Sequence, residues 1–298
     1  MENGCMDSFH EARRTYSHCA LITLSALLLI QGLGFLLSWL VRDLSLRPQD
    51  ALLITQLPLP LVLIPAYFWL RPKEQEAAAP GAIRLEEFPA LFLAALPIIY
   101  GGNLLGNLLA SLLTMGRAVN RLGELSSRMT VPLAIYVTFV GPLAEELFFR
   151  GMILPRMTCF GQKTALVFSA LLFALYHVNL YQFFYAFGLG LLLGALYLKT
   201  GSIRMGYVLH AAINLLGGVL PPLLLNLSLG AVAVFGLIML VLSGFGVMFL
   251  LRFKRETVFP PAPKELPPDI GRQAAFRSAG FVLLLILSLA GSLLDLYL

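Results

Sequence analysis

Residues 229–251 read LGAVAVFGLIMLVLSGFGVMFLL, a run of 23 residues that contains no charged side chain. An α-helix that crosses a bilayer needs about 20 predominantly apolar residues, so this run predicts a membrane-spanning helix. On both sides of it, eight further stretches satisfy or nearly satisfy the same criterion. They are residues 19–41, 51–70, 88–115, 130–154, 164–179, 182–198, 205–225 and 279–297.

The composition supports the same class of protein. Of the 298 residues, 58% are hydrophobic and only 12% are charged. Soluble domains are about 45–50% apolar and about 25% charged, so this chain has too few charges to cover a soluble surface. Intrinsic disorder, which needs low hydrophobicity and high charge, is excluded as well. No nucleic-acid partner is expected, because no basic face with interleaved aromatic residues is present. The sequence predicts an all-α, polytopic membrane helical bundle of about eight to nine transmembrane helices in a lipid bilayer.

Lys and Arg residues indicate the orientation, because cytoplasmic loops carry an excess of them. With the N-terminus inside, 16 of the 21 basic residues lie in cytoplasmic segments. The residues left outside are Arg42, Arg47, Arg117, Arg121 and Arg128. Arg13 and Arg14 precede the first span, which indicates a retained signal anchor because it is too long for a signal peptide. We therefore expect an integral, multi-pass membrane protein with a cytoplasmic N-terminus.

A few ionisable residues fall inside the predicted spans, where a charge costs about 2.5–3.5 kcal/mol on insertion scales. Glu145 and Glu146 lie well inside the fourth span. Glu146 and Arg150 are four residues apart and share a helix face, which is typical of an ion pair. Glu145 lies about 100° around the helix from Glu146, so the same arginine does not account for it. Asp295 lies near the last turn of the final span and is expected to reach the membrane interface.

Two of the four histidines, His177 and His210, also fall inside predicted spans. Phe173 precedes His177 by four residues and Asn214 follows His210 by four, so each pair projects from one helix face. A single intramembrane histidine is typical of an interhelical hydrogen bond. Together with Glu145, however, these polar residues come from three separate spans, which favours a common site.

The depths of these residues can be compared along the chain. Glu145 and His177 are equally far from Gly161, which lies in an expected turn, so they should lie at similar depth. His210 is about 6 residues into its span, or about 9 Å at 1.5 Å per residue. We therefore expect it to be shallower, unless the boundary is misplaced, the helix is tilted or the fifth and sixth spans form a re-entrant hairpin.

Such a set of side chains favours hydrolysis of an amide in a sheltered cavity. A carboxylate and a neutral imidazole can hold a water molecule and take its proton. A second imidazole and a carboxamide can donate to a developing oxyanion. The same Glu/His set could instead bind zinc, whose catalytic sites use three protein ligands and a water. The sequence contains no HExxH motif, and the three cysteines have no metal-type spacing.

Three short motifs occur in order, each in a different predicted span. They are EExxxR at residues 145–150, FxxxH at 173–177 and HxxxN at 210–214. Together they resemble the CPBP family of intramembrane proteases, which includes the type II CAAX prenyl proteases, or Ras-converting enzymes, and Abi-type proteins. The resemblance covers about residues 131–220.

The resemblance implies a role for each motif residue. Glu145 would be the general base, and His177 would help to hold the nucleophilic water. His210 and Asn214 would stabilise the oxyanion.

Other motif residues, Glu146, Arg150 and Phe173, would support and position the catalytic groups. We favour a glutamate mechanism without a cofactor over a metalloendopeptidase. If zinc is present, its ligands would be Glu145, His177 and His210.

The resemblance also suggests a division of the chain. The expected parts are a cytoplasmic tail at 1–18, membrane helices at 19–130, a protease core at 131–220 and C-terminal membrane helices at 221–298. The last part contains a Pro-rich linker at 258–270, which predicts an extended spacer, with the final span behind it as an appendage.

The predicted function is that of an intramembrane endopeptidase that acts on a membrane-bound peptide or protein. The resemblance leaves open whether the substrate carries a prenylated C-terminus, a bacteriocin sequence or a C-terminal sorting signal. The short span at 164–179 and the compact polar tail favour a prokaryotic member, hence a bacterial inner or plasma membrane. The alternative is a non-catalytic immunity or scaffold protein of the membrane whose Glu/His cluster is structural.

Overall fold

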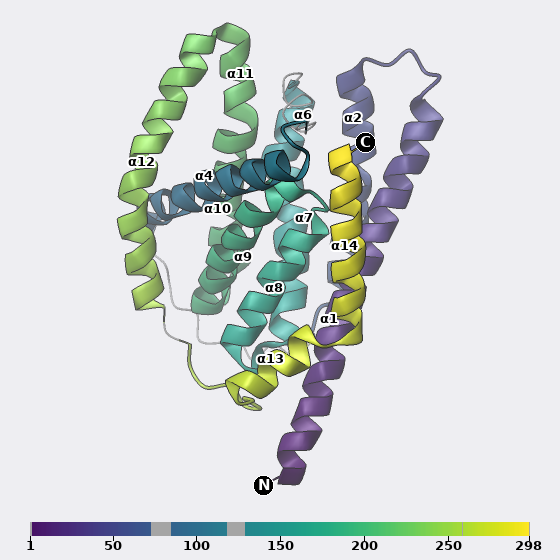
Figure 1. Ribbon diagram of the computed structural model, residues 1–298, viewed down its shortest axis with the longest axis vertical. Helices are drawn as coiled ribbons and strands as arrows, with labels where there is room; N and C mark the ends of the chain where they lie inside the picture. Colours follow the sequence, from purple (N-terminus) through teal and green to yellow (C-terminus); the bar gives the residue numbers. More distant parts are fainter. Residues whose placement is uncertain (1, 73–84, 118–128, 258, 298) are drawn as a thin grey trace.

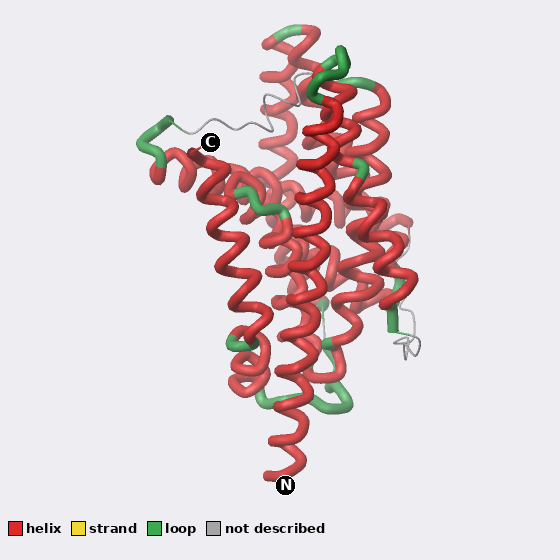
Figure 2. The backbone as a smooth tube through the Cα atoms, turned by 90° about the vertical axis from the view of Figure 1, so that its right-hand side faces the viewer, coloured by secondary structure: helices red, strands yellow, loops and turns green. Residues whose placement is uncertain are grey.

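The computed structural model describes residues 2–72, 85–117, 129–257 and 259–297. Within these ranges every regular element is helical, and the backbone tube contains no strand (Figure 2). Eight of the described helical segments are long and apolar enough to cross a membrane. The predicted all-helical, polytopic fold is confirmed, and the chain is an integral, multi-pass membrane protein.

The chain begins with a long helix, α1, at Glu2–Val41. It starts well before the predicted span because its N-terminal part is also packed. Ala12 and Tyr16 are fully buried there, and the ring of Tyr16 lies edge-on to Phe168 with 4.9 Å between centroids. Residues 2–18, expected as a tail, therefore continue the first helix.

Two helices, α2 at Pro48–Gln56 and α3 at Pro58–Leu70, together form the second span. A proline begins each of them, as is common at the first helical position, where the missing N–H would have no partner. Helix α3 packs against α1 and against α7, the helix that carries the two adjacent glutamates.

Helix α4, at Phe88–Leu113, crosses the bundle at a steep angle to its neighbours (Figure 1). It packs closely on α9, at Leu180–Thr200. A Cβ atom added to Gly102 would lie only 2.5 Å from the Cα atom of Tyr185 on α9. This glycine therefore allows the two backbones to approach each other, as small residues do between membrane helices.

The fourth predicted span is irregular. It comprises α6 (Val131–Ile135), the π-helical turn η2 (Tyr136–Val140), α7 (Gly141–Phe148) and the π-helical turn η3 (Phe149–Ile153). Two short 3₁₀ turns, η4 (Leu154–Arg156) and η5 (Thr158–Phe160), follow. Helix α7 thus lies between two π-helical turns, an arrangement that is rare and often found at functional sites.

Helices α8, at Gln162–Tyr176, and α9 form the next hairpin. Helix α8 has 15 residues, or about 22 Å, whereas the hydrocarbon core is about 30 Å thick. It is therefore too short to count among the eight candidate spans. The turn that follows it, at residues 177–179, packs against α14 (Ala279–Tyr297): a Cβ on Gly291 would lie 2.5 Å from Val178.

The seventh predicted span begins inside the bundle and ends at one edge of the molecule, where the eighth span also stands (Figure 1). They comprise α10 (Ile203–Asn214), the π-helical turn η6 (Leu215–Val219), α11 (Leu220–Leu227) and α12 (Leu229–Glu256). Ser228 caps α12 by accepting a hydrogen bond from the N–H of Ala231. The run quoted first is therefore the apolar part of one continuous helix.

The C-terminal region consists of α13, at Pro268–Phe276, and α14. The Pro-rich segment before α13 is not a free spacer, because its backbone N–H groups at Lys264 and Leu266 donate to carbonyl groups of η5. Helix α14 is not an appendage either. It packs on α1 so tightly that a Cβ on Gly280 would lie 2.2 Å from the Ser17 carbonyl.

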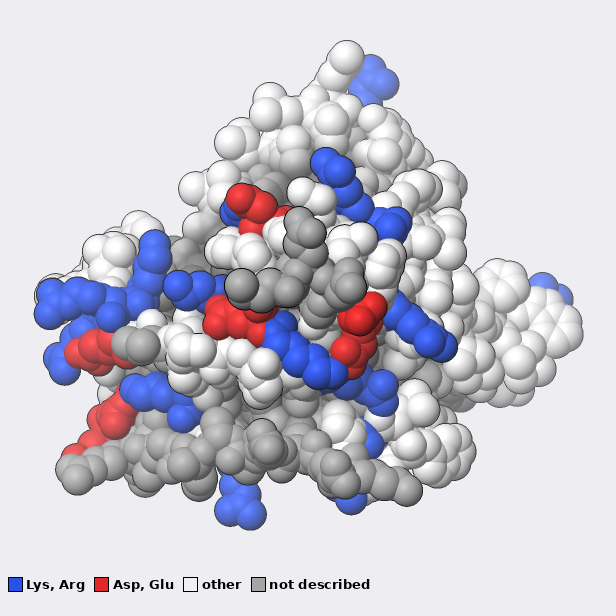
Figure 3. All heavy atoms as spheres, turned by 90° about the horizontal axis from the view of Figure 1, so that it is seen from below, with Lys and Arg blue, Asp and Glu red and all other residues white. Residues whose placement is uncertain are grey.

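The lower end of the molecule, where the N-terminus lies, carries Lys and Arg side chains interspersed with Asp and Glu (Figures 1 and 3). Lys264 pairs there with Glu11, with 2.7 Å between Nζ and Oε1. The hydrogen bond to Glu11 raises the pKa of Lys264 above its ordinary value. This contact links the segment after α12 to α1.

Candidate active site

The predicted site residues meet at one cavity of about 620 Å³. Glu145, His177, His210 and Asn214 all line it. They come from α7, from the C-terminal end of α8 and from α10. The structure therefore brings together the polar residues that the three motifs contain.

Glu146 is fully buried behind this cavity. Its Oε1 atom is 2.8 Å from Nη1 of Arg150 and 3.0 Å from Nδ1 of His210. The arginine is the partner that the sequence spacing predicts, whereas the histidine comes from another helix. Because a carboxylate only accepts hydrogen bonds, Nδ1 of His210 carries a proton in this contact. The shared carboxylate thus joins α7 to α10 and orients the imidazole.

Glu145 is the carboxylate that faces the cavity. Its Oε2 atom lies 3.7 Å from Nε2 of His210, too far for a direct hydrogen bond but within ion-pair distance. His210 is therefore level with both glutamates, and the expectation that it is shallower was wrong. That expectation assumed straight spans that cross the membrane, whereas α8 is too short to cross and the fourth span contains two π-helical turns.

His177 follows the last residue of α8. Its Nδ1 atom lies 2.7 Å from the carbonyl oxygen of Phe173, four residues earlier. A carbonyl only accepts, so Nδ1 carries the proton in this contact and Nε2 is the acceptor of the neutral imidazole. The local helix geometry therefore sets the tautomer that a water-holding histidine needs.

Phe173 lies among the charged and aromatic groups of the site. Its ring centroid is 4.8 Å from that of His177 and 6.0 Å from that of His210, both edge-on. The guanidinium carbon of Arg150 lies 4.5 Å from the same centroid, within cation–π range. This phenylalanine therefore contacts both histidines and the buried arginine.

The turn after His177 is held in an unusual conformation. Val178 has φ +47°, which is strained for a β-branched residue. Asn179 caps α9 by accepting a hydrogen bond from the N–H of Gln182 at 3.1 Å. Its Nδ2 atom donates to Asp295 of α14 at 3.0 Å. The turn that positions His177 is thus fixed by α9 on one side and by α14 on the other.

Asn214 ends α10 and points toward the fourth span. Its Nδ2 atom donates to the carbonyl oxygen of Val137 at 2.9 Å. Val137 belongs to the π-helical turn η2, and Asn214 immediately precedes the π-helical turn η6. One N–H of the carboxamide is used in this contact, so the second remains for another acceptor.

Several polar residues that the sequence reasoning did not assign to the site also line this cavity. They are Gln31, Asn103, Tyr136, Asn179, Gln182 and Asp295. An acid or amide inside an apolar span is costly, and this signal could have identified Asn103 as a candidate. Asp295 was noted on this ground but expected at the membrane interface, whereas it lines the cavity. The signal could not have placed either residue beside the motif residues, because that depends on the packing of α4 and α14.

The zinc alternative requires three suitably placed ligands. In the ranges that the structure describes, no group of three His, Cys, Asp or Glu residues is arranged to hold a metal ion. Glu145 and His210 approach each other, but no third ligand among the described residues completes a metal site with them.

Fold and site together define a polytopic helical membrane protein with carboxylate and imidazole groups in an internal cavity. Residues 127–216 match the family model described as type II CAAX prenyl endopeptidase, Rce1-like. This match contains all three motifs, so the resemblance inferred from the sequence is confirmed for this part of the chain. No curated protein and no solved structure was found to match.

Proposed function

We propose that this protein is a CAAX-type intramembrane endopeptidase that hydrolyses a peptide bond of a membrane-associated polypeptide. One observation carries the proposal: Glu145, His177, His210 and Asn214 line a single cavity inside a membrane-spanning bundle. All four also lie in the segment that matches the protease family. A purely structural role for the cluster would not require Glu145 to face the cavity.

In the first step, the carboxylate of Glu145 takes a proton from a water molecule while the water oxygen attacks the carbonyl carbon of the scissile bond. Nε2 of His177 accepts a hydrogen bond from the same water and orients it. The carbonyl π electrons move to oxygen and form the oxyanion. Glu145 then returns the proton to the leaving nitrogen as the C–N bond breaks, so one water is consumed per bond.

Asn214 and His210 stabilise the oxyanion in this mechanism. The carboxamide of Asn214 donates its second N–H. Because Nδ1 of His210 already donates to Glu146, its Nε2 can donate only when the ring is an imidazolium. Glu145, Glu146 and Arg150 surround that ring as two carboxylates and one guanidinium.

The test is cleavage of membrane-anchored reporter peptides by the purified full-length chain. Removing the general base with Glu145→Gln should lower the cleavage rate by about 10²–10⁴-fold, and His177→Ala should also lower it strongly. Matched controls are Glu256→Gln and His10→Ala, which change exposed side chains away from the cavity. If Glu145→Gln and His177→Ala both cleave at the wild-type rate, the protease assignment is wrong.

Two further experiments with the same assay test whether a metal is needed and which class of substrate is cleaved. After treatment with a chelator and removal of the metal, a glutamate mechanism retains its activity. Loss of activity that zinc restores would replace this mechanism by metal chemistry held by Glu145, His177 and His210. Reporters with a prenylated C-terminus, a bacteriocin leader or a C-terminal sorting signal then distinguish the substrate classes by their relative cleavage rates.

A further inference from the structure

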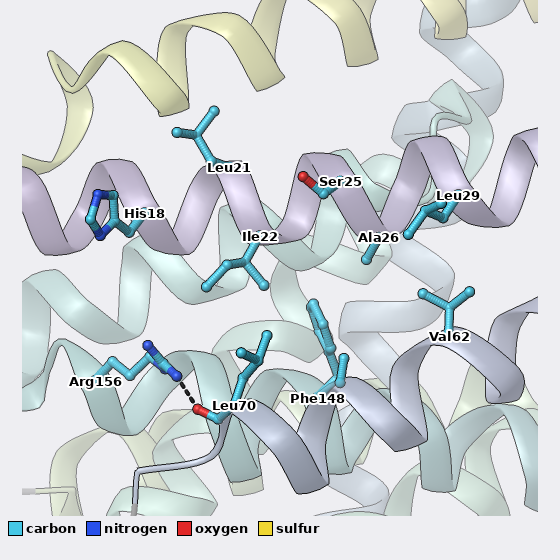
Figure 4. Close-up of a pocket in the computed structure, with 11 residues that line it drawn as sticks. His18, Leu21, Ile22, Ser25, Ala26, Leu29, Val62, Leu70, Phe148 and Arg156 are labelled. Carbon is cyan, nitrogen blue, oxygen red and sulfur yellow. Dashed lines mark hydrogen bonds between the residues drawn. The ribbon is translucent and has the colours of Figure 1, made fainter.

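A second cavity, of about 390 Å³, lies between α1 and α3 on the flank of the bundle (Figure 4). Its walls are mostly apolar and include Ile22 and Val62, with Phe148 of α7 at its base. Leu21 and Leu29 on its rim are exposed. Because α1 and α3 belong to membrane-spanning segments, this rim is accessible to the acyl chains of the bilayer. The volume falls in the range of small-ligand pockets, about 300–1,000 Å³.

The cavity has a polar end and an apolar end. His18 and Arg156 lie together at one end, whereas Leu29 and Val62 lie at the other (Figure 4). An amphipathic ligand with a head group at one end and an alkyl chain at the other has the same arrangement.

The guanidinium of Arg156 has an N–H donor that no described acceptor uses. It donates from Nη2 to the carbonyl oxygen of Leu70, at the C-terminal end of α3. Its Nε atom is buried without a hydrogen-bond partner among the described residues, and no described acid pairs with this guanidinium. A buried donor without a partner costs about 1–3 kcal/mol. The guanidinium therefore favours an anionic acceptor that enters from the cavity.

We propose that this cavity binds one anionic phospholipid, with its phosphate on Arg156 and His18 and an acyl chain along the apolar wall formed by Leu29 and Val62. The fork of N–H donors on arginine suits a phosphate group. His18 precedes the first predicted span and Arg156 follows the fourth, so both belong to segments predicted to be cytoplasmic. Anionic lipids are concentrated in the cytoplasmic leaflet, and each basic residue adds about 1 kcal/mol of attraction.

The binding test uses the purified full-length chain in a neutral detergent, with phosphatidylglycerol or phosphatidylcholine added at equal concentrations. Native mass spectrometry measures bound lipid, and the shift of the melting temperature gives an independent readout, since a ligand bound only to the folded state stabilises it. We expect phosphatidylglycerol to bind preferentially. Arg156→Gln should weaken its binding about fivefold.

The matched control is Arg255→Gln, which removes a charge from the C-terminal end of α12, away from the cavity. It should bind phosphatidylglycerol like the wild type. Equal binding of phosphatidylglycerol to the wild type and to Arg156→Gln, or equal loss in both arginine variants, would overturn the proposal.

A second pair of variants tests the apolar end. Ala66→Phe places a ring in the cavity and should reduce lipid binding without removing a charge, whereas Ala233→Phe on an exposed face of α12 should not. Inorganic phosphate alone distinguishes a lipid from a free anion. If phosphate stabilises the protein as well as phosphatidylglycerol does, or Ala66→Phe binds lipid normally, the acyl chain does not occupy this cavity. None of these readouts depends on proteolysis.

Discussion

At the scale of single residues, Glu146 shows how a buried charge is tolerated. It accepts hydrogen bonds from Arg150 and His210, and both the glutamate and the arginine are almost completely buried. An isolated buried charge is costly, so each member of the cluster depends on the others.

Replacing the arginine should therefore be strongly destabilising. Arg150→Met leaves Glu146 with only the histidine as a partner, and we expect the free energy of unfolding to fall by about 3–5 kcal/mol. Thermal unfolding in detergent measures this change. The control is Arg252→Met, which breaks an exposed i,i+4 pair with Glu256 and should have little effect. Equal melting temperatures for the two variants would contradict the assigned role of Arg150.

Sequence reasoning found the members of this cluster but not all of their contacts. The four-residue spacing of Glu146 and Arg150 predicts their ion pair, because helix geometry alone brings them together. The contact with His210 joins residues 64 positions apart, and it depends on how α10 packs against α7. Local spacing cannot predict such a contact, and the same limitation made the expected depth of His210 wrong.

At the scale of elements, the contact of α4 with α9 depends on glycine at one position. Gly102→Ala should destabilise the protein by about 1–3 kcal/mol, because its Cβ would meet the backbone of Tyr185. Tyr185 lines the cavity, so the cleavage rate should fall as well. The adjacent Gly101→Ala is a matched control, since nothing lies within 4 Å of its added Cβ. Thermal unfolding and cleavage are measured for both variants. If the two variants lose stability and cleavage rate to a similar extent, the close approach of α4 to α9 at Gly102 is not required.

The turn at 177–179 offers a second element to test. Asn179→Ala removes the N-cap of α9 and should cost about 1 kcal/mol. Asn179→Asp keeps an acceptor for the cap but places a carboxylate beside Asp295, so it should be more destabilising. Adding Asp295→Asn to Asn179→Asp restores the hydrogen bond, because the new amide can donate to the new carboxylate. The double variant should therefore recover stability, as measured by thermal unfolding. If Asn179→Asp is as stable as the wild type, the contact with α14 does not hold the turn.

Hydropathy predicted the positions of the helices better than their lengths. A hydrophobic run at 164–179 resembles the other spans, yet α8 ends at Tyr176 and the next residues enter the cavity wall. Apolar composition does not distinguish a helix that faces lipid from one that ends inside the protein. Similarly, the polar residues before Cys19 gave no sign of burial, because the packing of α1 on α13 and α14 joins distant parts of the chain.

At the scale of the whole molecule, composition was sufficient to predict an all-helical membrane protein. It could not predict that α4 crosses the bundle (Figure 1) or that α14 contributes to the cavity. Both features depend on side-chain packing between segments far apart in sequence. The distribution of Lys and Arg predicts which end faces the cytoplasm, and this orientation can be tested directly.

Single cysteines provide that test in a variant whose native cysteines are replaced by serine. Leu227→Cys lies at the exposed turn between α11 and α12, and Lys254→Cys lies at the other end of α12. A membrane-impermeant maleimide should label Leu227→Cys in intact cells and Lys254→Cys only after permeabilisation, because basic segments stay in the cytoplasm. The reverse labelling pattern would show the opposite orientation.

The packing of α14 on α1 has a consequence for the order in which the protein is assembled during its synthesis. Helix α14 follows every other described helix in the chain, yet it packs on the first helix and brings Asp295 to the cavity wall. A nascent chain therefore inserts its other helices before α14 is present to complete the wall of this cavity. The cavity proposed for hydrolysis would therefore be complete only after α14 has packed on α1.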